Sequence, residues 1–119
     1  MKEDNVIEEK TKLFAIRIIN LYKFLTLNAP LKEFVMSKQV LKSGTSIGAN
    51  VREALRGQSL ADFRAKMNIS LKEACETGYW LELLHETEYI DENSYNSIKN
   101  DNTEIIKILT KIVKNTDSN

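Results

Sequence analysis

The chain has 119 residues, which fits a single domain with one hydrophobic core and leaves too little for a second. Hydrophobic residues make up 42% of it, which excludes a disordered chain, and a formal net charge of zero is unlike that of a dedicated nucleic-acid coat protein. Only four glycines and one proline are present, so a β-rich fold with many turns is excluded and long helices are favoured.

The first predicted helix covers residues 5–27. Its apolar residues recur at helical spacing, as expected for one buried stripe: Phe14, Ile18, Leu21 and Leu25. Asn28-Ala29-Pro30 ends this helix, because proline cannot continue it. Asn28 is the expected N-cap of the second helix, which is predicted to begin at residue 31.

The second predicted helix covers residues 31–56 and has three faces when its residues are placed at 100° per residue. The first face is apolar and is expected to be buried: it holds Val40, Gly44, Ile47, Val51 and Ala54. Gly44 on this face and Gly48 beside it indicate either the close approach of a neighbouring helix or a local kink.

The second face is polar and carries mostly short side chains that compete with the helix for backbone hydrogen bonds. Its members are Gln39, Ser43, Ser46, Asn50 and Glu53. A solvated surface would usually hold more lysine and glutamate, so these residues suggest a hydrogen-bonded network that sets helix register or lines a subunit contact. An ordinary solvated surface is the alternative.

The third face is basic, and its four cations lie within roughly 40° of one direction with no acidic residue among them. These residues, which we call the basic stripe, are Lys38, Lys42, Arg52 and Arg56. A row of cations suits a phosphate backbone. A solvated face, or pairing with the next helix, explains the stripe equally well, because residues 29–58 carry five basic and two acidic side chains whereas residues 59–88 carry three and six.

The third predicted helix covers residues 60–87, with Gly57 ending the previous helix and Ser59 as the expected N-cap. One apolar stripe faces the bundle: Phe63, Met67, Ala74, Gly78 and Leu81. A second group points roughly the opposite way, and we call it the aromatic patch: Ile69, Tyr79, Trp80 and Leu83. Tryptophan and tyrosine are enriched at interface centres, so the aromatic patch predicts a homo-oligomer contact. The alternative is that Trp80 covers a helix end within one chain.

The fourth predicted helix covers residues 92–114, with Asp91 as its expected cap. Its apolar stripe is Ile98, Ile105, Leu109 and Ile112. Short connections between four amphipathic helices force neighbours to run antiparallel. The sequence therefore predicts an all-α fold, an antiparallel up-down four-helix bundle that forms a single domain over residues 1–119.

Residues with catalytic chemistry are scarce, so we expect no enzyme activity, no cofactor and no metal site. His85 is the only histidine and Cys75 the only cysteine, which leaves no zinc spacing and no pair of nucleophile and base. Phosphate-binding glycine loops are also missing. The sequence shows neither a secretory leader nor an apolar run of membrane length, so a cytoplasmic protein without membrane contact is expected.

Residues 43–54 of the second helix resemble the Ser-x-x-x-Asn-x-x-Glu-Ala stretch of the bacterial 23S rRNA intervening-sequence protein family, with Ser46, Asn50 and Glu53 at the motif positions. The resemblance extends over residues 8–113 and includes Tyr79-Trp80-Leu81 and Tyr89-Ile90. The chain departs from the family pattern at Glu88, where a glycine is common. It also departs at Gly48.

The resemblance implies an antiparallel four-helix bundle that forms a ring-like homo-oligomer, typically a pentamer. Some family members are encoded within insertions of 23S ribosomal RNA genes, and related accessory variability proteins of diversity-generating retroelements bind reverse transcriptase and nucleic acid. Those relatives are strongly basic, whereas this chain has no net charge.

Two functional hypotheses follow. In the first, an oligomeric accessory or scaffold bundle contacts RNA, or an RNA-binding protein, through the basic stripe. In the second, the chain is a protein-interaction module without a nucleic-acid role, and it acts through Tyr79 and Trp80.

Overall fold

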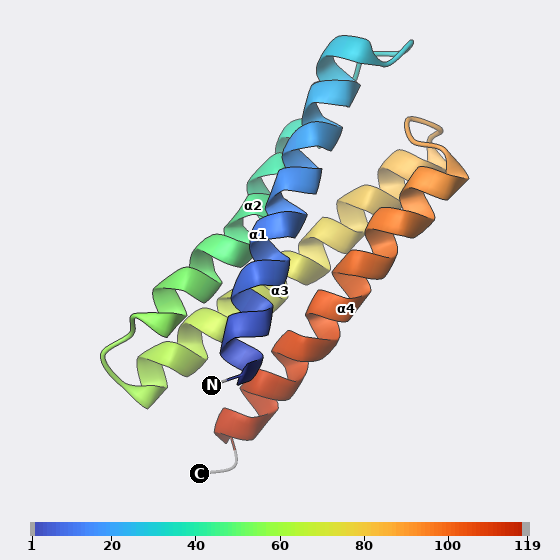
Figure 1. Cartoon of the computed structure of the whole chain (residues 1–119). Helices are drawn as coiled ribbons and strands as arrows, with labels where there is room; N and C mark the ends of the chain where they lie inside the picture. The colour runs from blue at the N-terminus through green and yellow to red at the C-terminus, as the bar shows by residue number, and fades with distance from the viewer. Residues whose placement is uncertain (1, 118–119) are drawn as a thin grey trace.

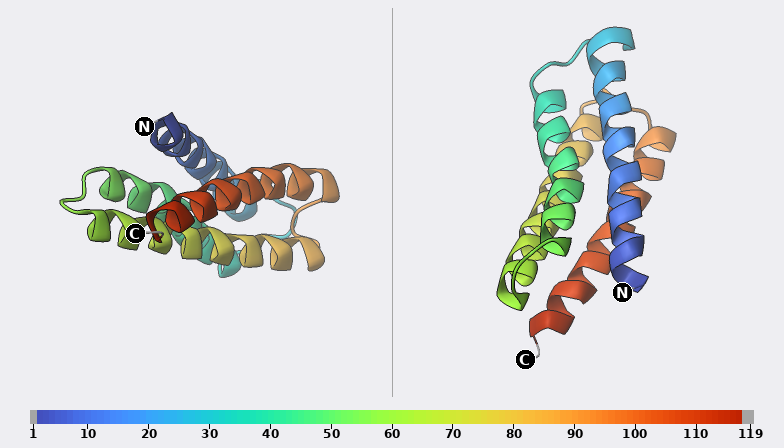
Figure 2. Two further views of the ribbon diagram at one scale, coloured as in Figure 1. Left: turned by 90° about the horizontal axis from the view of Figure 1, so that it is seen from below. Right: turned by 60° about the vertical axis from the view of Figure 1, so that its left-hand side comes forward.

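The computed structural model describes residues 2–117, and these form four helices (Figure 1). The helices are α1 (Lys2–Lys23), α2 (Met36–Leu55), α3 (Leu60–Glu86) and α4 (Glu92–Asp117), with a π-helical turn, η1 (Phe24–Asn28), that continues α1. No strand occurs among the described residues. Successive helices run antiparallel in a bundle of 50 × 21 × 20 Å, which confirms the all-α four-helix bundle (Figures 1 and 2).

The predicted apolar stripes form the core. Every stripe residue is buried or partly buried, and the partly buried side chains, such as Leu21 and Phe63, pack against the others. The most extensive helix contact joins α2 to α3, whereas α1 packs mainly on α2 and has only a small contact with α4. One flank of α1 is therefore only lightly covered by the rest of the bundle.

Two of the predicted helix caps are confirmed. The Ser59 hydroxyl accepts a hydrogen bond from the backbone N–H of Asp62 at 3.1 Å, and the Asp91 carboxylate accepts one from the N–H of Ser94 at 2.8 Å. Gly57 follows the C-cap of α2 but does not adopt a left-handed backbone. A glycine is still favourable there, because a Cβ atom would lie 2.8 Å from an Asp62 carboxylate oxygen.

The start of the second helix differs from the prediction. The helix begins at Met36 rather than residue 31, and its N-cap residue is Val35, whose side chain forms no capping hydrogen bond. The acceptor expected of Asn28 is supplied instead by Glu33. The Glu33 carboxylate is buried and accepts hydrogen bonds from the N–H groups of Val35, Met36 and Ser37, at 3.1, 3.0 and 2.6 Å. Residues 29–35 therefore form an ordered connection rather than a first helical turn.

Gly44 and Gly48 mark the crossing of α1 and α2. A Cβ atom at Gly44 would lie 2.7 Å from Cγ1 of Ile18, and one at Gly48 would lie 3.3 Å from the carbonyl oxygen of Thr11. The close helix approach expected at these glycines is therefore confirmed, and α2 is continuous through both positions.

Glu88, in the turn between α3 and α4, has a backbone φ of 71° and is the one non-glycine residue with positive φ among the described residues. Side chains strain a left-handed backbone by about 1–2 kcal/mol, and glycine removes that strain. We therefore predict that Glu88→Gly raises the melting temperature by a few degrees, the equivalent of about 1 kcal/mol. Thr87→Gly, at a φ of −97°, is the matched control and should lower it; equal shifts would contradict the prediction.

Candidate nucleic-acid interface

Three residues of the basic stripe, Lys38, Lys42 and Arg52, lie on α2, and Arg56 is the C-cap residue directly after it. All four side chains are exposed. At 1.5 Å per residue, its first and last members are about 27 Å apart along the helix axis. Arg52 forms an ion pair with Glu8 of α1, with 3.4 Å between its Nε and the carboxylate oxygen. Within residues 2–117 the other three form no ion pair.

The acidic third helix approaches the basic stripe at Glu73. Partial burial and the neighbouring Glu76 carboxylate raise the pKa of Glu73, while the positive charge of Lys42 and a hydrogen bond from Ser46 act in the opposite direction. This opposing charge covers only the middle of the basic stripe. Lys38 and Arg56, at its two ends, form no ion pair among residues 2–117.

The family-motif residues form mostly local contacts. The Ser46 hydroxyl donates to the carbonyl of Lys42 at 2.7 Å, and the Asn50 amide donates to the carbonyl of Ser46 at 2.8 Å. Glu53 reaches the next helix, where its carboxylate lies 3.2 Å from the Lys66 ammonium group. Of the motif residues, Glu53 therefore joins α2 to α3, whereas Ser46 and Asn50 bond to the backbone of α2.

The buried polar contacts between helices come from other residues. The Thr77 hydroxyl donates to the Ser43 hydroxyl at 2.9 Å, and the Ser70 hydroxyl donates to the carbonyl of Ile47 at 2.8 Å. Between α3 and α4, the Asn102 amide donates to the carbonyl of Ala74 at 3.0 Å. Of these residues, Ser43 was predicted from the sequence to join a polar network, and Asn102 was not.

The aromatic patch is only partly exposed in the structure. Ile69 and Tyr79 are 42% and 56% exposed, whereas Trp80 and Leu83 are partly buried. Trp80 packs against the core, donates a hydrogen bond to Glu76 at 3.2 Å and meets the Tyr79 ring edge-on at 5.5 Å. Only the outer half of the aromatic patch can therefore meet a partner directly.

A larger apolar surface lies elsewhere and was missed. Nine of the twelve exposed large hydrophobic residues occur between residues 6 and 35, on α1, η1 and the connection to α2. On α1 they include Leu13 and Ile16, which point away from the core stripe. The signal was present in the sequence, because the first helix carries apolar residues on more than one face.

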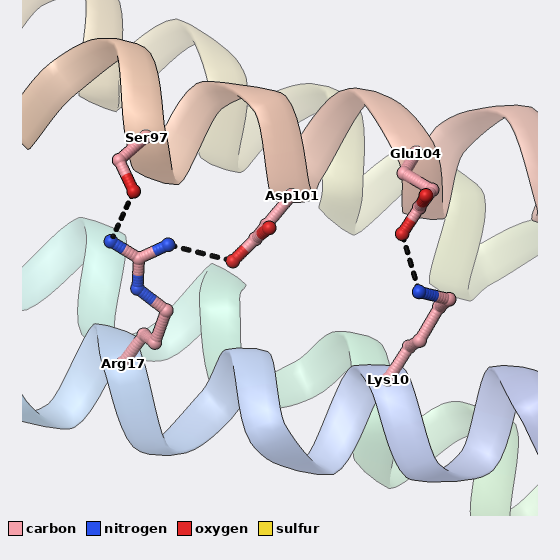
Figure 3. A network of polar contacts seen from close by, with 5 residues as sticks. All are labelled: Lys10, Arg17, Ser97, Asp101 and Glu104. Atoms are coloured by element: carbon pink, nitrogen blue, oxygen red, sulfur yellow. Dashed lines mark hydrogen bonds and ion pairs between the residues drawn. The ribbon is translucent and has the colours of Figure 1, made fainter.

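Two ion pairs join α1 to α4 on their solvent side (Figure 3). Lys10 contacts Glu104, and the Arg17 guanidinium donates to Asp101 at 2.7 Å and to Ser97 at 3.1 Å. Beyond Arg17, the two helices leave a cavity of about 420 Å³. It is lined by apolar side chains with polar groups, including Asn20 and Asp91, alongside them, and we call it the end groove.

The described residues hold no cluster of three or more histidine, cysteine, aspartate or glutamate side chains that could bind a metal ion. The same residues include no helix with the length and apolar character needed to cross a bilayer. His85 stacks on Tyr95 with ring centroids 4.2 Å apart, and its Nε2 lies 3.3 Å from a Glu92 carboxylate oxygen. This histidine therefore joins α3 to α4 at their connection.

These features define a helical-bundle protein with an exposed row of cations on one helix and an apolar N-terminal surface. The sequence model of the 23S rRNA-intervening sequence protein family matches residues 3–111, so the chain belongs to this family. Among solved structures, it is similar to a crystal structure from Bacteroides thetaiotaomicron VPI-5482, described as a protein with unknown function from the S23 ribosomal protein family. The two are 62% identical, with a TM-score of 0.91 over 94% of this chain and 98% of the other. No curated protein matches the chain.

Proposed function

We propose that this chain is a non-catalytic, cytoplasmic, self-assembling bundle that binds RNA phosphates through the basic stripe. The observation that carries this proposal is the placement of four exposed cations along one side of α2 and its C-cap residue, Arg56. Three of them form no ion pair within the described structure, so they can contact phosphates without first breaking one.

The geometry suits a backbone rather than a single phosphate. Lys38 and Lys42 are one helical turn apart, as are Arg52 and Arg56, and about 15 Å separate the two pairs along the axis. Such a row contacts several phosphates of an extended strand but reads no base edges. The expected binding is therefore largely independent of RNA sequence. Self-assembly would repeat the row and multiply the number of contacts.

The net charge of zero does not oppose this proposal, because the charges are segregated along the chain. The excess of cations lies on α2 and the excess of carboxylates on α3. A local positive potential can therefore persist on a chain without net charge, although it acts over only about 10 Å at 0.1 M salt.

We predict that four phosphate contacts per chain give a salt dependence of about −2.8 for log K against log salt, using the single-strand coefficient of about 0.7. Affinity should then fall about 50-fold between 50 and 200 mM salt. Replacing Lys38 and Lys42 by alanine should reduce the slope by about 1.4. Fluorescence anisotropy with a labelled single-stranded RNA measures both quantities.

The matched control replaces Lys107 and Lys114 of α4, which are also exposed, and removes the same amount of charge. This control should leave the slope nearly unchanged. If the two double variants weaken binding equally, the basic stripe is not the RNA site. If the assembled protein has no RNA affinity at low salt, the proposed function is wrong.

A second function rests on the exposed half of the aromatic patch. Tyr79 is 56% exposed and packs on Trp80, an arrangement that suits a protein partner. In this case, Tyr79→Ala should abolish partner binding and leave RNA affinity intact. Tyr79 is a better probe than Trp80, because Trp80 also packs against the core.

A further inference from the structure

The connection between η1 and α2 presents an unusual apolar surface, which we call the apolar turn (Leu31, Lys32, Phe34 and Val35). Leu31, Phe34 and Val35 are 69%, 60% and 73% exposed. This segment joins the ends of two helices at one end of the bundle (Figure 1). Large exposed apolar groups that lie close together usually indicate an interaction site.

Hydrogen bonds of Glu33 fix the backbone of the apolar turn. The buried Glu33 carboxylate accepts three backbone hydrogen bonds, and the N–H of Glu33 donates to the carbonyl of Leu25 at 3.0 Å. Ala29 is also buried. The exposed side chains are therefore presented on an ordered backbone, which reduces the conformational entropy lost on binding.

The end groove has room for apolar side chains of this size. Its cavity of about 420 Å³ lies within the range of about 300–1,000 Å³ typical of binding pockets. Leu21, Phe24, Ile90 and Ile98 supply its apolar lining. Phe24 is 41% exposed although it lines the cavity, so it has apolar surface still to bury.

The charges are complementary as well. The apolar turn carries one exposed cation, Lys32, and the end groove carries one exposed anion, Asp91. The Arg17 guanidinium of the end groove is already paired with Asp101. The apolar turn of a second copy supplies both a cation for Asp91 and apolar side chains for the end groove. Its net charge of zero adds no overall repulsion between copies.

We infer that the apolar turn of one copy packs into the end groove of a second copy, with Lys32 beside Asp91. This inference rests on the self-assembly part of the proposed function and names the surfaces that meet. The contact joins two different surfaces, so it can continue from copy to copy and close into a ring if the rotation permits.

Analytical ultracentrifugation of the full chain tests this contact. The wild type should sediment as a multiple of 13.7 kDa, whereas Phe34→Asp and Leu31→Asp should each sediment as a single chain. Both side chains are exposed, so circular dichroism should show the helical content of the wild type. Ile69→Asp, in the aromatic patch, is the matched control and should keep the assembled mass.

A mixture of two variants with complementary defects provides a second test of the contact. Phe24→Asp alters the end groove but leaves the apolar turn intact, and Phe34→Asp does the reverse. Mixed in equal amounts, the two variants should form pairs of twice the single-chain mass, because one intact contact remains possible.

Wild-type mass for both variants would overturn the inference while leaving self-assembly in place, as would dissociation by Ile69→Asp alone. A wild type that sediments at 13.7 kDa at all concentrations would overturn both the inference and self-assembly, with RNA affinity still to be measured separately.

Discussion

Replacing Gly44 by valine should lower the free energy of unfolding by about 3 kcal/mol, at the upper end of the range for overpacked cores. A Cβ atom at this position would lie 2.7 and 2.8 Å from the two γ carbons of Ile18, which is fully buried. Ile18 is β-branched and has few alternative rotamers, so it cannot turn away. The helices α1 and α2 must therefore separate.

Urea denaturation measures this effect, and Ala49→Val provides the control. Ala49 is exposed on the same helix, so its replacement should cost only the lower helix propensity of valine, less than about 1 kcal/mol. Ile18→Ala removes the colliding carbons. The double variant should lose less stability than the two single variants lose in sum, by at least about 1 kcal/mol. Strict additivity would show that the two residues do not compete for the same space.

Replacing Glu33 by alanine should lower the free energy of unfolding by about 2 kcal/mol, the upper end for loss of a helix cap. The substitution removes the acceptor for three backbone N–H groups at the start of α2, including one from the buried Ser37. Glu33→Gln keeps one acceptor oxygen and should cost less. Because the same carboxylate orders the apolar turn, Glu33→Ala should also weaken self-assembly.

Glu53→Ala is the control for this prediction. Glu53 is exposed and forms one surface ion pair with Lys66, an interaction worth no more than about 1 kcal/mol. Chemical denaturation of both variants under the same conditions separates the two roles. Equal destabilisation by Glu33→Ala and Glu53→Ala would show that the cap contributes no more than a surface charge.

The helices and their buried faces could be predicted from the sequence because burial in a bundle repeats at the helical period. Val40, Ile47 and Val51 recur at that period, and all three are fully buried. The start of α2 could not be predicted in the same way. Caps are usually short side chains such as asparagine, which favoured Asn28, whereas the longer Glu33 side chain accepts from N–H groups two to four residues further along the chain.

The basic stripe could be predicted because exposure on a helix follows from the angle between residues. Contacts between helices could not, because the hydrogen bond from Thr77 to Ser43 depends on how far α3 is shifted along α2. The apolar N-terminal surface was missed for a different reason. The aromatic residues of the third helix favoured an interface at Trp80, which is partly buried, while only one apolar stripe of the first helix was considered and Leu13 and Ile16 were left unassigned.

RNA binding by the assembled protein is best tested by sedimentation with a fluorescent single-stranded RNA at low salt. We expect the RNA to sediment with the assembled wild type, and an assembled Lys38→Ala/Lys42→Ala variant to carry less of it. If the RNA does not sediment with the assembled wild type, the protein does not bind RNA through the basic stripe.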